Sequence, residues 1–298
     1  MALYGAIEAG GTKFVCAIAG GHDDILDTAT FPTTTPEETM EAVCGYFEDY
    51  QQRTGQAFDS IGVACFGPID MDKSSDKYGY ITSTPKPGWQ DTDVVGALNG
   101  RFGVPIGFDT DVNAAAYGEY LWGAGKDLGV VLYLTVGTGI GGGLCVNGKP
   151  LHGLLHPEMG HVIMQQDKTK DPFECACPFH ESCLEGLASG KAVDLRWGVH
   201  ASELGDDHEA WDLEADYLAQ GIVDYVLTCS PHKIIIGGGL MHKEILYPKV
   251  RTKVKEKLND YIKAPAILND IDNYIVAPGL GTKSGISGAI GLAMEVIK

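Results

Sequence analysis

Residues 156–185 read HPEMGHVIMQQDKTKDPFECACPFHESCLE, and this stretch concentrates metal-binding side chains. Its cysteines Cys177 and Cys183 flank His180 in a C-x₂-H-x₂-C spacing, and His161 lies sixteen residues before Cys177. Two thiolates and two imidazoles complete a tetrahedral zinc shell, with Zn–S bonds of about 2.3 Å and Zn–N bonds of about 2.0–2.1 Å. Four protein ligands leave no open position, so we predict a structural zinc knuckle formed by His161, Cys177, His180 and Cys183.

Two other interpretations of these cysteines stay open. A disulfide among Cys175, Cys177 and Cys183 is one, although neighbours two residues apart bridge poorly. Isolated buried thiols are the other. Within the zinc interpretation, Cys175 is an alternative to Cys177 as a ligand. We favour Cys177 because Cys175 lies farther from the other donors along the chain.

Length and composition describe an ordinary globular protein of about two domains. The chain has 298 residues, 44% hydrophobic and 21% charged, with a net charge of −18. That charge disfavours nucleic acid and anionic membranes as partners, because both require a basic surface. We find no run of the roughly 18 apolar residues that a membrane helix requires, and no signal peptide. Free cysteines in strand-like runs, such as Cys16 and Cys65, favour the reducing cytoplasm.

A glycine turn lies between two apolar runs near the N-terminus. Residues 4–7 and 14–19 are typical of a β-hairpin whose turn contains Gly10, Gly11, Thr12 and Lys13. Successive N–H groups in such a turn can cradle a phosphate, and Lys13 adds a positive charge. The Walker pattern is absent, and an ordinary hairpin turn is the alternative.

The same strand–turn–strand pattern occurs again in the middle of the chain. The strand-like run 129–136 enters Gly137, Thr138 and Gly139, and a second hairpin follows. This repeat predicts two similar α/β units whose turns hold nucleotide phosphates between them. A third glycine group, Gly237, Gly238 and Gly239, follows the buried run 234–236. There a flat base or ribose can lie against the backbone.

A carboxylate follows the predicted strand 104–108. Asp111 stands where that strand turns into a helix, and ligands of open α/β sheets bind at such strand ends. Asp111 is therefore a candidate general base, and helix capping is the alternative role. In the preceding proline-rich loop, Trp89 is either a sugar-stacking or lid residue or an anchor of the loop that fills a gap in the core. We expect Asp91 to cap the next helix, which ends near Phe102.

These motifs together resemble the ROK family, which contains sugar kinases and sugar-responsive repressors. The family motif D-x-G-G-T-K corresponds to residues 8–13, N-D-x-N to 110–113, the second phosphate loop to 137–143, and E-x-G-H to 158–161. The resemblance implies an α/β, two-domain, actin-like or ribonuclease-H-like ATPase fold with the zinc knuckle in the larger domain. We assign residues 1–118 with 283–298 to the small domain and 119–282 to the large domain.

Departures from the family pattern resemble the bacterial fructokinase branch. Glu8 replaces an aspartate, Thr110 replaces an asparagine and His180 replaces a cysteine. The resemblance implies ATP-dependent phosphorylation of fructose to fructose 6-phosphate, with Mg²⁺, by a cytoplasmic homodimer. It makes Asp111 the general base. It assigns sugar contacts to Thr110, Asn113, Glu158, His161 and Glu185.

Alternative functions stay open at this point. The nearest is a ROK hexokinase with another specificity, such as glucose, mannose or an N-acetylhexosamine. A sugar-sensing repressor is disfavoured because the first phosphate turn begins at Glu8, without a preceding helix-turn-helix, and because the charge is acidic. A third alternative is a binding module that hydrolyses ATP to drive a conformational change. This alternative is disfavoured because it gives no role to Glu158, His161 and Glu185.

Overall fold

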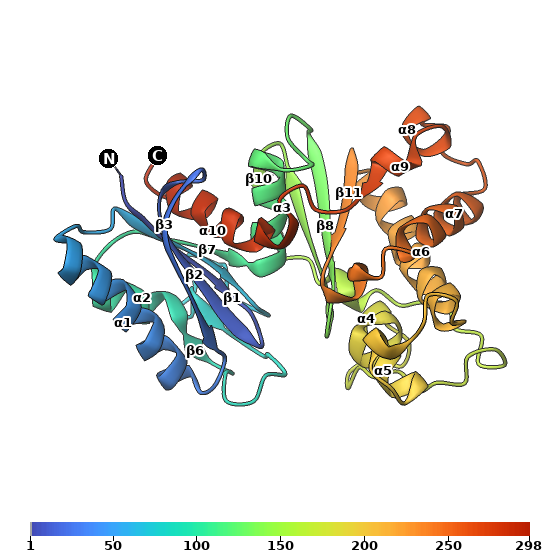
Figure 1. The fold of residues 1–298 in the computed structure, drawn as a ribbon, viewed down its shortest axis with the longest axis horizontal. Helices are drawn as coiled ribbons and strands as arrows, with labels where there is room; N and C mark the ends of the chain where they lie inside the picture. The colour runs from blue at the N-terminus through green and yellow to red at the C-terminus, as the bar shows by residue number, and fades with distance from the viewer. Residues whose placement is uncertain (1) are drawn as a thin grey trace.

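The computed structural model describes residues 2–298, which form two α/β lobes (Figure 1). Each lobe is built on a mixed five-stranded sheet, with the strand orders β3-β2-β1-β4-β7 and β10-β9-β8-β11-β12. Both sheets begin with an antiparallel meander and continue with two parallel strands. The two sheets therefore share one topology, as the repeated strand–turn–strand pattern predicts.

The strands of the first sheet are β1 (Tyr4–Ala9), β2 (Lys13–Gly21), β3 (Asp24–Pro32), β4 (Ser60–Cys65) and β7 (Ile106–Thr110). Those of the second are β8 (Val130–Val136), β9 (Ile140–Val146), β10 (Lys149–Pro150), β11 (Lys233–Gly237) and β12 (Ile275–Val276). A separate two-stranded sheet pairs β5 (Tyr80–Ile81) with β6 (Thr92–Asp93).

The α-helices of residues 2–298 are α1 (Pro36–Thr54), α2 (Val94–Phe102), α3 (Asp111–Trp122), α4 (Leu184–Ala188), α5 (Gly190–Trp197), α6 (Ala210–Cys229), α7 (Leu246–Leu258), α8 (Pro265–Leu268), α9 (Ile271–Tyr274) and α10 (Ser284–Glu295). Helices α1 and α2 pack on the first sheet, and α6 packs against α7 beside the second.

Local chemistry explains the helix starts, with one correction. The Thr35 hydroxyl accepts the Glu38 N–H at the start of α1, and Pro36 is the first residue of that helix. The expectation that Asp91 caps α2 is wrong, because the Asp93 carboxylate accepts the Gly96 N–H at 2.7 Å. Asp91 instead pairs with Lys77. Strand β3 is an addition to the predicted N-terminal hairpin.

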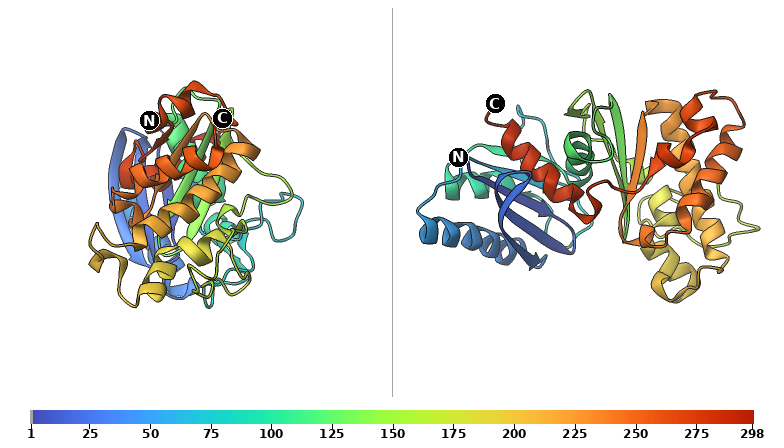
Figure 2. Two further views of the ribbon diagram at one scale, coloured as in Figure 1. Left: turned by 90° about the vertical axis from the view of Figure 1, so that its right-hand side faces the viewer. Right: turned by 45° about the horizontal axis from the view of Figure 1, so that its top comes forward.

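Helices α3 and α10 pack between the two sheets (Figures 1 and 2). Helix α10 returns from the second lobe to pack on β1, β4 and β7, so the C-terminus ends beside the first sheet. The two helices approach closely because their contact consists of small residues: a Cβ atom on Gly288 would lie 1.8 Å from the Ala114 carbonyl oxygen. Helix α3 also contacts β8 and β9 of the second lobe. The domain boundary predicted at residue 118 therefore falls inside this helix, which runs from Asp111 to Trp122.

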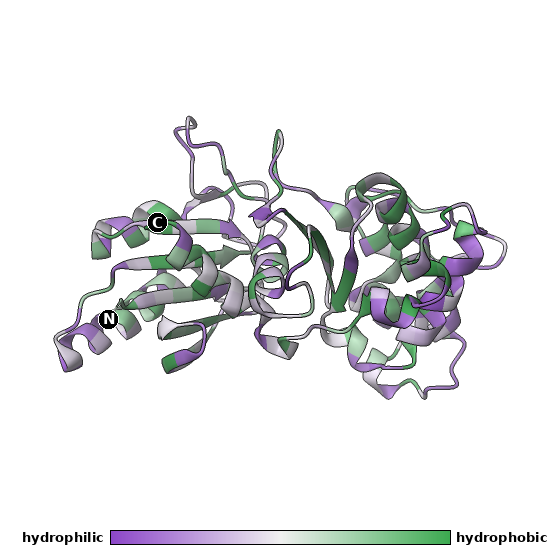
Figure 3. Ribbon diagram, turned by 90° about the horizontal axis from the view of Figure 1, so that it is seen from above, coloured by the Kyte–Doolittle hydropathy of each residue, from purple (hydrophilic) through white to green (hydrophobic). Residues whose placement is uncertain are grey.

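Hydrophobic side chains concentrate in the sheets. Figure 3 shows mostly hydrophobic central strands in the second lobe, whereas the outer helices carry both hydrophobic and hydrophilic residues. The largest buried cluster joins β8, β9 and β11 to α6 and α7. Among residues 2–298, no helix combines the length and apolar character needed to cross a bilayer.

Candidate active site between the lobes

Asp111 is the first residue of α3 and directly follows β7. The strands β1, β4 and β7 are parallel, so their carboxyl ends meet at one edge of the sheet. Asp111 lines a cavity of ≈ 440 Å³ at this edge, together with Glu8 from the end of β1. The strand-to-helix turn therefore delivers the predicted general base into a cavity between the lobes.

The neighbouring Asp109 turns into the protein instead. It is 1% exposed and accepts hydrogen bonds from its own neighbour, the Thr110 N–H, at 2.8 Å and from Asn113 Nδ2 at 2.9 Å. Asn113 is also fully buried, and its oxygen accepts the Leu144 N–H at 3.2 Å. Thr110 caps α3 by accepting the Asn113 N–H. Sugar binding by Thr110 and Asn113 stays a prediction, since these atoms already bind within the protein.

Four acidic side chains, Glu8, Asp111, Glu158 and Glu185, contribute to the electrostatics on and near this cavity. Burial, assisted by the negative charges of Glu8 and Glu158, raises the pKa of Asp111 to about 7. Burial and the charge of Glu185 raise the pKa of Glu158 to about 7. Burial also raises the pKa of Glu8, although Lys13 opposes that shift. A cation or a bound hydroxyl placed among these groups would relieve their repulsion.

The glycines of the third motif form one wall of the cavity. Gly237, Gly238 and Gly239 line it as Asp111 does, and Gly239 also lines a second cavity of ≈ 860 Å³ with Gly137 and Thr138. Gly238 has φ = 94°, and a Cβ atom there would lie 2.4 Å from the Val136 carbonyl oxygen. Only glycine meets both conditions without strain.

The first glycine turn is exposed and closed by its own backbone. Gly10 N–H donates to the Lys13 carbonyl at 3.0 Å, and Thr33 N–H donates to the Thr12 carbonyl. Gly11, Thr12 and Lys13 are exposed. In the second turn, Gly137 N–H donates to the Gly139 carbonyl at 2.9 Å. The exposed atoms of both turns are thus available to an anion.

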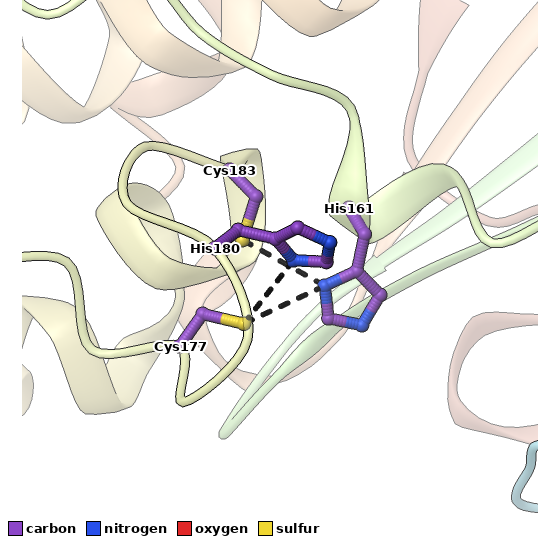
Figure 4. Close-up of side chains that lie close together, drawn as sticks. All are labelled: His161, Cys177, His180 and Cys183. Carbon is purple, nitrogen blue, oxygen red and sulfur yellow. Dashed lines mark hydrogen bonds between the residues drawn. The ribbon is translucent and has the colours of Figure 1, made fainter.

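The four predicted metal ligands lie together (Figure 4). Their donor atoms all lie within 4.8 Å of one another. The Sγ atom of Cys177 is 3.4 Å from His180 Nδ1 and 3.9 Å from His161 Nδ1, and Cys183 Sγ is 3.6 Å from His161 Nδ1. Zinc bond lengths and a tetrahedral angle separate sulfur from nitrogen by roughly 3.6 Å, so the set fits a zinc ion.

Cys175 lies outside that group of four. A Cβ atom on Gly186 would come within 2.0 Å of the Cys175 Sγ, so this thiol packs on the backbone at the start of α4. All eight cysteines are free thiols. The expected disulfide alternative therefore finds no support among the described residues.

His161 connects the metal-ligand group to the acidic groups. Its Nδ1 faces the two sulfurs, and its Nε2 lies 4.0 Å from Glu185 Oε1. The other oxygen, Glu185 Oε2, accepts the Ile140 N–H at 2.9 Å. A metal on Nδ1 leaves the proton on Nε2, which then points toward Glu185 as a donor.

Trp89 does not serve as a sugar-stacking residue. Its side chain is 0% exposed, and its Nε1 donates to the Thr34 carbonyl at 2.8 Å. It packs between the rings of Phe14 and Phe66. The sugar-stacking alternative is wrong and the loop-anchor alternative is confirmed, because the loop folds back onto the first sheet.

Two histidines near the acidic groups were not predicted as functional. His152 Nε2 lies 2.9 Å from Asp109 Oδ2, and His156 Nδ1 lies 3.4 Å from Glu158 Oε1. One indication that His156 is functional was available in the sequence: it lies two residues before Glu158. His152 and Asp109 are 43 residues apart, and no local pattern predicts their contact.

Fold and site together define a two-lobed α/β kinase with an interlobe cavity. The chain belongs to the ROK family, whose sequence model matches residues 4–296. It is 44% identical to the fructokinase of Pediococcus pentosaceus over 296 residues, covering 99% of both chains. It is also 44% identical to the fructokinase of Zymomonas mobilis over 294 residues, covering 98% of this chain and 96% of the relative. The crystal structure of a ROK hexokinase from Thermus thermophilus superposes with a TM-score of 0.80 at 27% identity, covering 99% of both chains.

Proposed function

We propose that this chain is an ATP-dependent fructokinase that transfers the γ-phosphoryl group of ATP to the 6-hydroxyl of fructose, on an actin-like ATPase fold. The observation that carries the proposal is that Asp111 and the glycines 237–239 line the same interlobe cavity. The two fructokinases at 44% identity over almost the whole chain support the choice of sugar.

Asp111 acts as the general base. Its carboxylate accepts the proton of the attacking hydroxyl as the new O–P bond forms and the bond from the γ-phosphorus to the bridging oxygen breaks. A pKa of about 7 suits this role, since the base is partly ionised near neutral pH and still accepts a proton. Asp109 is excluded from this role because its carboxylate is turned inward.

Glu158, His161 and Glu185 hold the sugar by hydrogen bonds, together with Thr110 and Asn113 as predicted from the family motif. The carboxylates accept hydrogen bonds from sugar hydroxyls, and His161 Nε2 donates a hydrogen bond to the sugar. Zn²⁺ at His161, Cys177, His180 and Cys183 supplies a structural cross-link that fixes the imidazole. The 3.4–3.9 Å spacing of the donor atoms supports this assignment.

The nucleotide occupies the two cavities that meet at Gly239. Gly237, Gly238 and Gly239 form the floor under the nucleoside. The turns at 10–13 and 137–139 hold the phosphates; Gly137 and Thr138 of the second turn line the larger cavity. Mg²⁺, when bound with ATP, neutralises charge on the transferred phosphoryl group. The paired carboxylates of Glu8 and Asp111, both with raised pKa values, fit a nearby divalent cation.

A cytoplasmic location and a homodimer, both expected from the family resemblance, stay predictions. The test of the function is a coupled kinase assay with ATP and fructose, glucose, mannose or N-acetylhexosamines as acceptors. We expect fructose to give the highest kcat/KM. A higher kcat/KM for glucose or mannose would assign the chain to another ROK hexokinase specificity, and turnover of ATP without sugar would oppose kinase activity altogether.

A further inference from the structure

The loop 151–158 leaves the second lobe after β10 and contacts the first lobe through two histidines. His152 Nε2 reaches Asp109 Oδ2 at 2.9 Å, and His156 Nε2 accepts the Ile69 N–H at 3.1 Å. Ile69 belongs to the first lobe, beyond the end of β4. Glu158 is the last residue of this loop, and His156 lies two residues before it.

His156 is enclosed by the first-lobe segment that it binds. Its side chain is 2% exposed, and a Cβ atom on Gly67 would lie 3.4 Å from its Cε1. A buried imidazole in a tight site keeps one orientation. Its two nitrogens therefore face fixed partners: the Ile69 N–H on one side and the Glu158 carboxylate on the other.

The partners also fix the tautomer. The Ile69 N–H is a donor only, so Nε2 must accept and the proton of the neutral ring must sit on Nδ1. Nδ1 lies 3.4 Å from Glu158 Oε1, a distance at which its N–H and the carboxylate oxygen attract each other. Burial lowers the pKa of His156, in keeping with a neutral ring. The Glu158 side chain is 46% exposed, so its second oxygen is free to meet a ligand.

We infer that His156 is a positioning residue for the sugar site: its Nδ1–H holds one oxygen of Glu158, and its Nε2 ties that arrangement to the first lobe at Ile69. This inference rests on the proposed function, in which Glu158 accepts a sugar hydroxyl. Sugar affinity then depends on a histidine that does not itself touch the sugar.

Two substitutions separate the two nitrogens. The amide of His156→Asn lies where Nδ1 lies, so it keeps a donor for Glu158 but is too short to reach Ile69. The amide of His156→Gln lies where Nε2 lies, so it keeps an acceptor for Ile69 but loses the donor for Glu158. We expect His156→Gln to raise the KM for fructose about tenfold, with the KM for ATP changed less than twofold, and His156→Asn to stay within about threefold of wild type.

A double-mutant cycle with Glu158→Gln completes the test. If His156 acts through Glu158, adding His156→Gln to Glu158→Gln raises the fructose KM by less than twofold further. His152→Asn is the matched control, because it breaks the other contact of the same loop without touching Glu158; its effect adds fully to that of Glu158→Gln. Thermal unfolding of each variant shows that it is folded. If His156→Gln does not fold, His156→Leu, which also lacks a donor for Glu158, takes its place in the cycle.

The opposite order, with His156→Gln near wild type and His156→Asn impaired, would assign His156 a purely structural link to Ile69 and overturn the inference. Full additivity of His156→Gln with Glu158→Gln would do the same. An inactive wild-type protein would instead count against the proposed function, so the two failures are distinguishable.

Discussion

The Asp109 carboxylate accepts a hydrogen bond from Asn113 Nδ2 at 2.9 Å inside the first lobe. This contact gives two nearby aspartates different surroundings, since Asp109 is buried among protein donors and Asp111 faces the cavity. The difference assigns the structural role to Asp109 and the chemical role to Asp111.

Replacing Asp111 with asparagine removes the base while keeping the shape of the side chain. We expect kcat to fall about 10³-fold, within the range that a general base contributes, because the attacking hydroxyl keeps its proton. Fructose affinity, measured by calorimetry, should change by only a few-fold. The exposed Asp76→Asn is the control and should retain full activity. Near-normal turnover in Asp111→Asn would remove this residue from its assigned role.

The pH dependence follows from the raised pKa of about 7 at Asp111. The base must be ionised to accept a proton, so kcat/KM for fructose should rise about tenfold per pH unit below pH 7 and level off above it. Glu158 has a similar pKa, so Glu158→Gln separates the two. That variant should keep the rise, whereas the residual activity of Asp111→Asn should lack it. A flat profile in the wild type would contradict the assignment.

Sequence patterns predicted the parts of the site whose residues are close along the chain. The spacing of Cys177, His180 and Cys183 indicated a metal site because a short segment can bring its own donors together, and the structure gathers them with His161. The glycine turns and the place of Asp111 followed from strand-to-turn patterns in the same way.

Contacts between distant residues were not predictable from such patterns. Trp89 was open between two roles because its partner, the Thr34 carbonyl, is 55 residues away. Strand β3 was absent from the prediction because its exposed, polar sequence lacks the apolar run of a buried strand. The interlobe contacts of His152 and His156 depend on how the two lobes sit together, which a single sequence does not encode locally.

Loss of one zinc ligand should weaken the protein and the site together. We expect Cys177→Ala to lose zinc, to lower the Tm by roughly 10 °C and to raise the fructose KM, because His161 is no longer fixed. Cys175→Ala is the matched control, since its thiol packs on Gly186 and should leave the zinc content unchanged. Metal analysis of both purified variants checks this. If Cys175→Ala lost the metal instead, the ligand assignment would be wrong.

Glu119 holds α3 to the segment that leads into α10. Its two oxygens accept hydrogen bonds from the N–H groups of Ala124, Gly279 and Leu280 and from the Ser284 hydroxyl, at 2.7–3.0 Å. In Glu119→Gln an amide group faces two of these donors, so we expect the free energy of unfolding to fall by about 3 kcal/mol in urea titrations. The exposed Glu256→Gln on α7 should change it by less than about 0.5 kcal/mol. If Glu119→Gln were as stable as the wild type, the four hydrogen bonds of Glu119 would not stabilise the packing of α3 against this segment.

Glu214 on α6 is 1% exposed, and neither carboxylate oxygen has a hydrogen-bond partner among residues 2–298. Burial raises its pKa well above the ordinary value of 4.5, so folding takes up a proton at this residue. The contribution of Glu214 to stability therefore declines as the pH rises above 4.5, by up to about 1.4 kcal/mol per pH unit until the folded-state pKa is reached.

The permanently neutral Glu214→Gln avoids this decline. We expect it to match the wild type near pH 4 and to become the more stable protein as the pH rises, measured by urea unfolding from pH 4 to 8. The exposed Glu203→Gln should follow the wild type throughout. If Glu214→Gln were less stable than the wild type at pH 8, the Glu214 carboxylate would have a stabilising hydrogen-bond or charge partner in the folded protein. The argument from burial would then not hold for this residue.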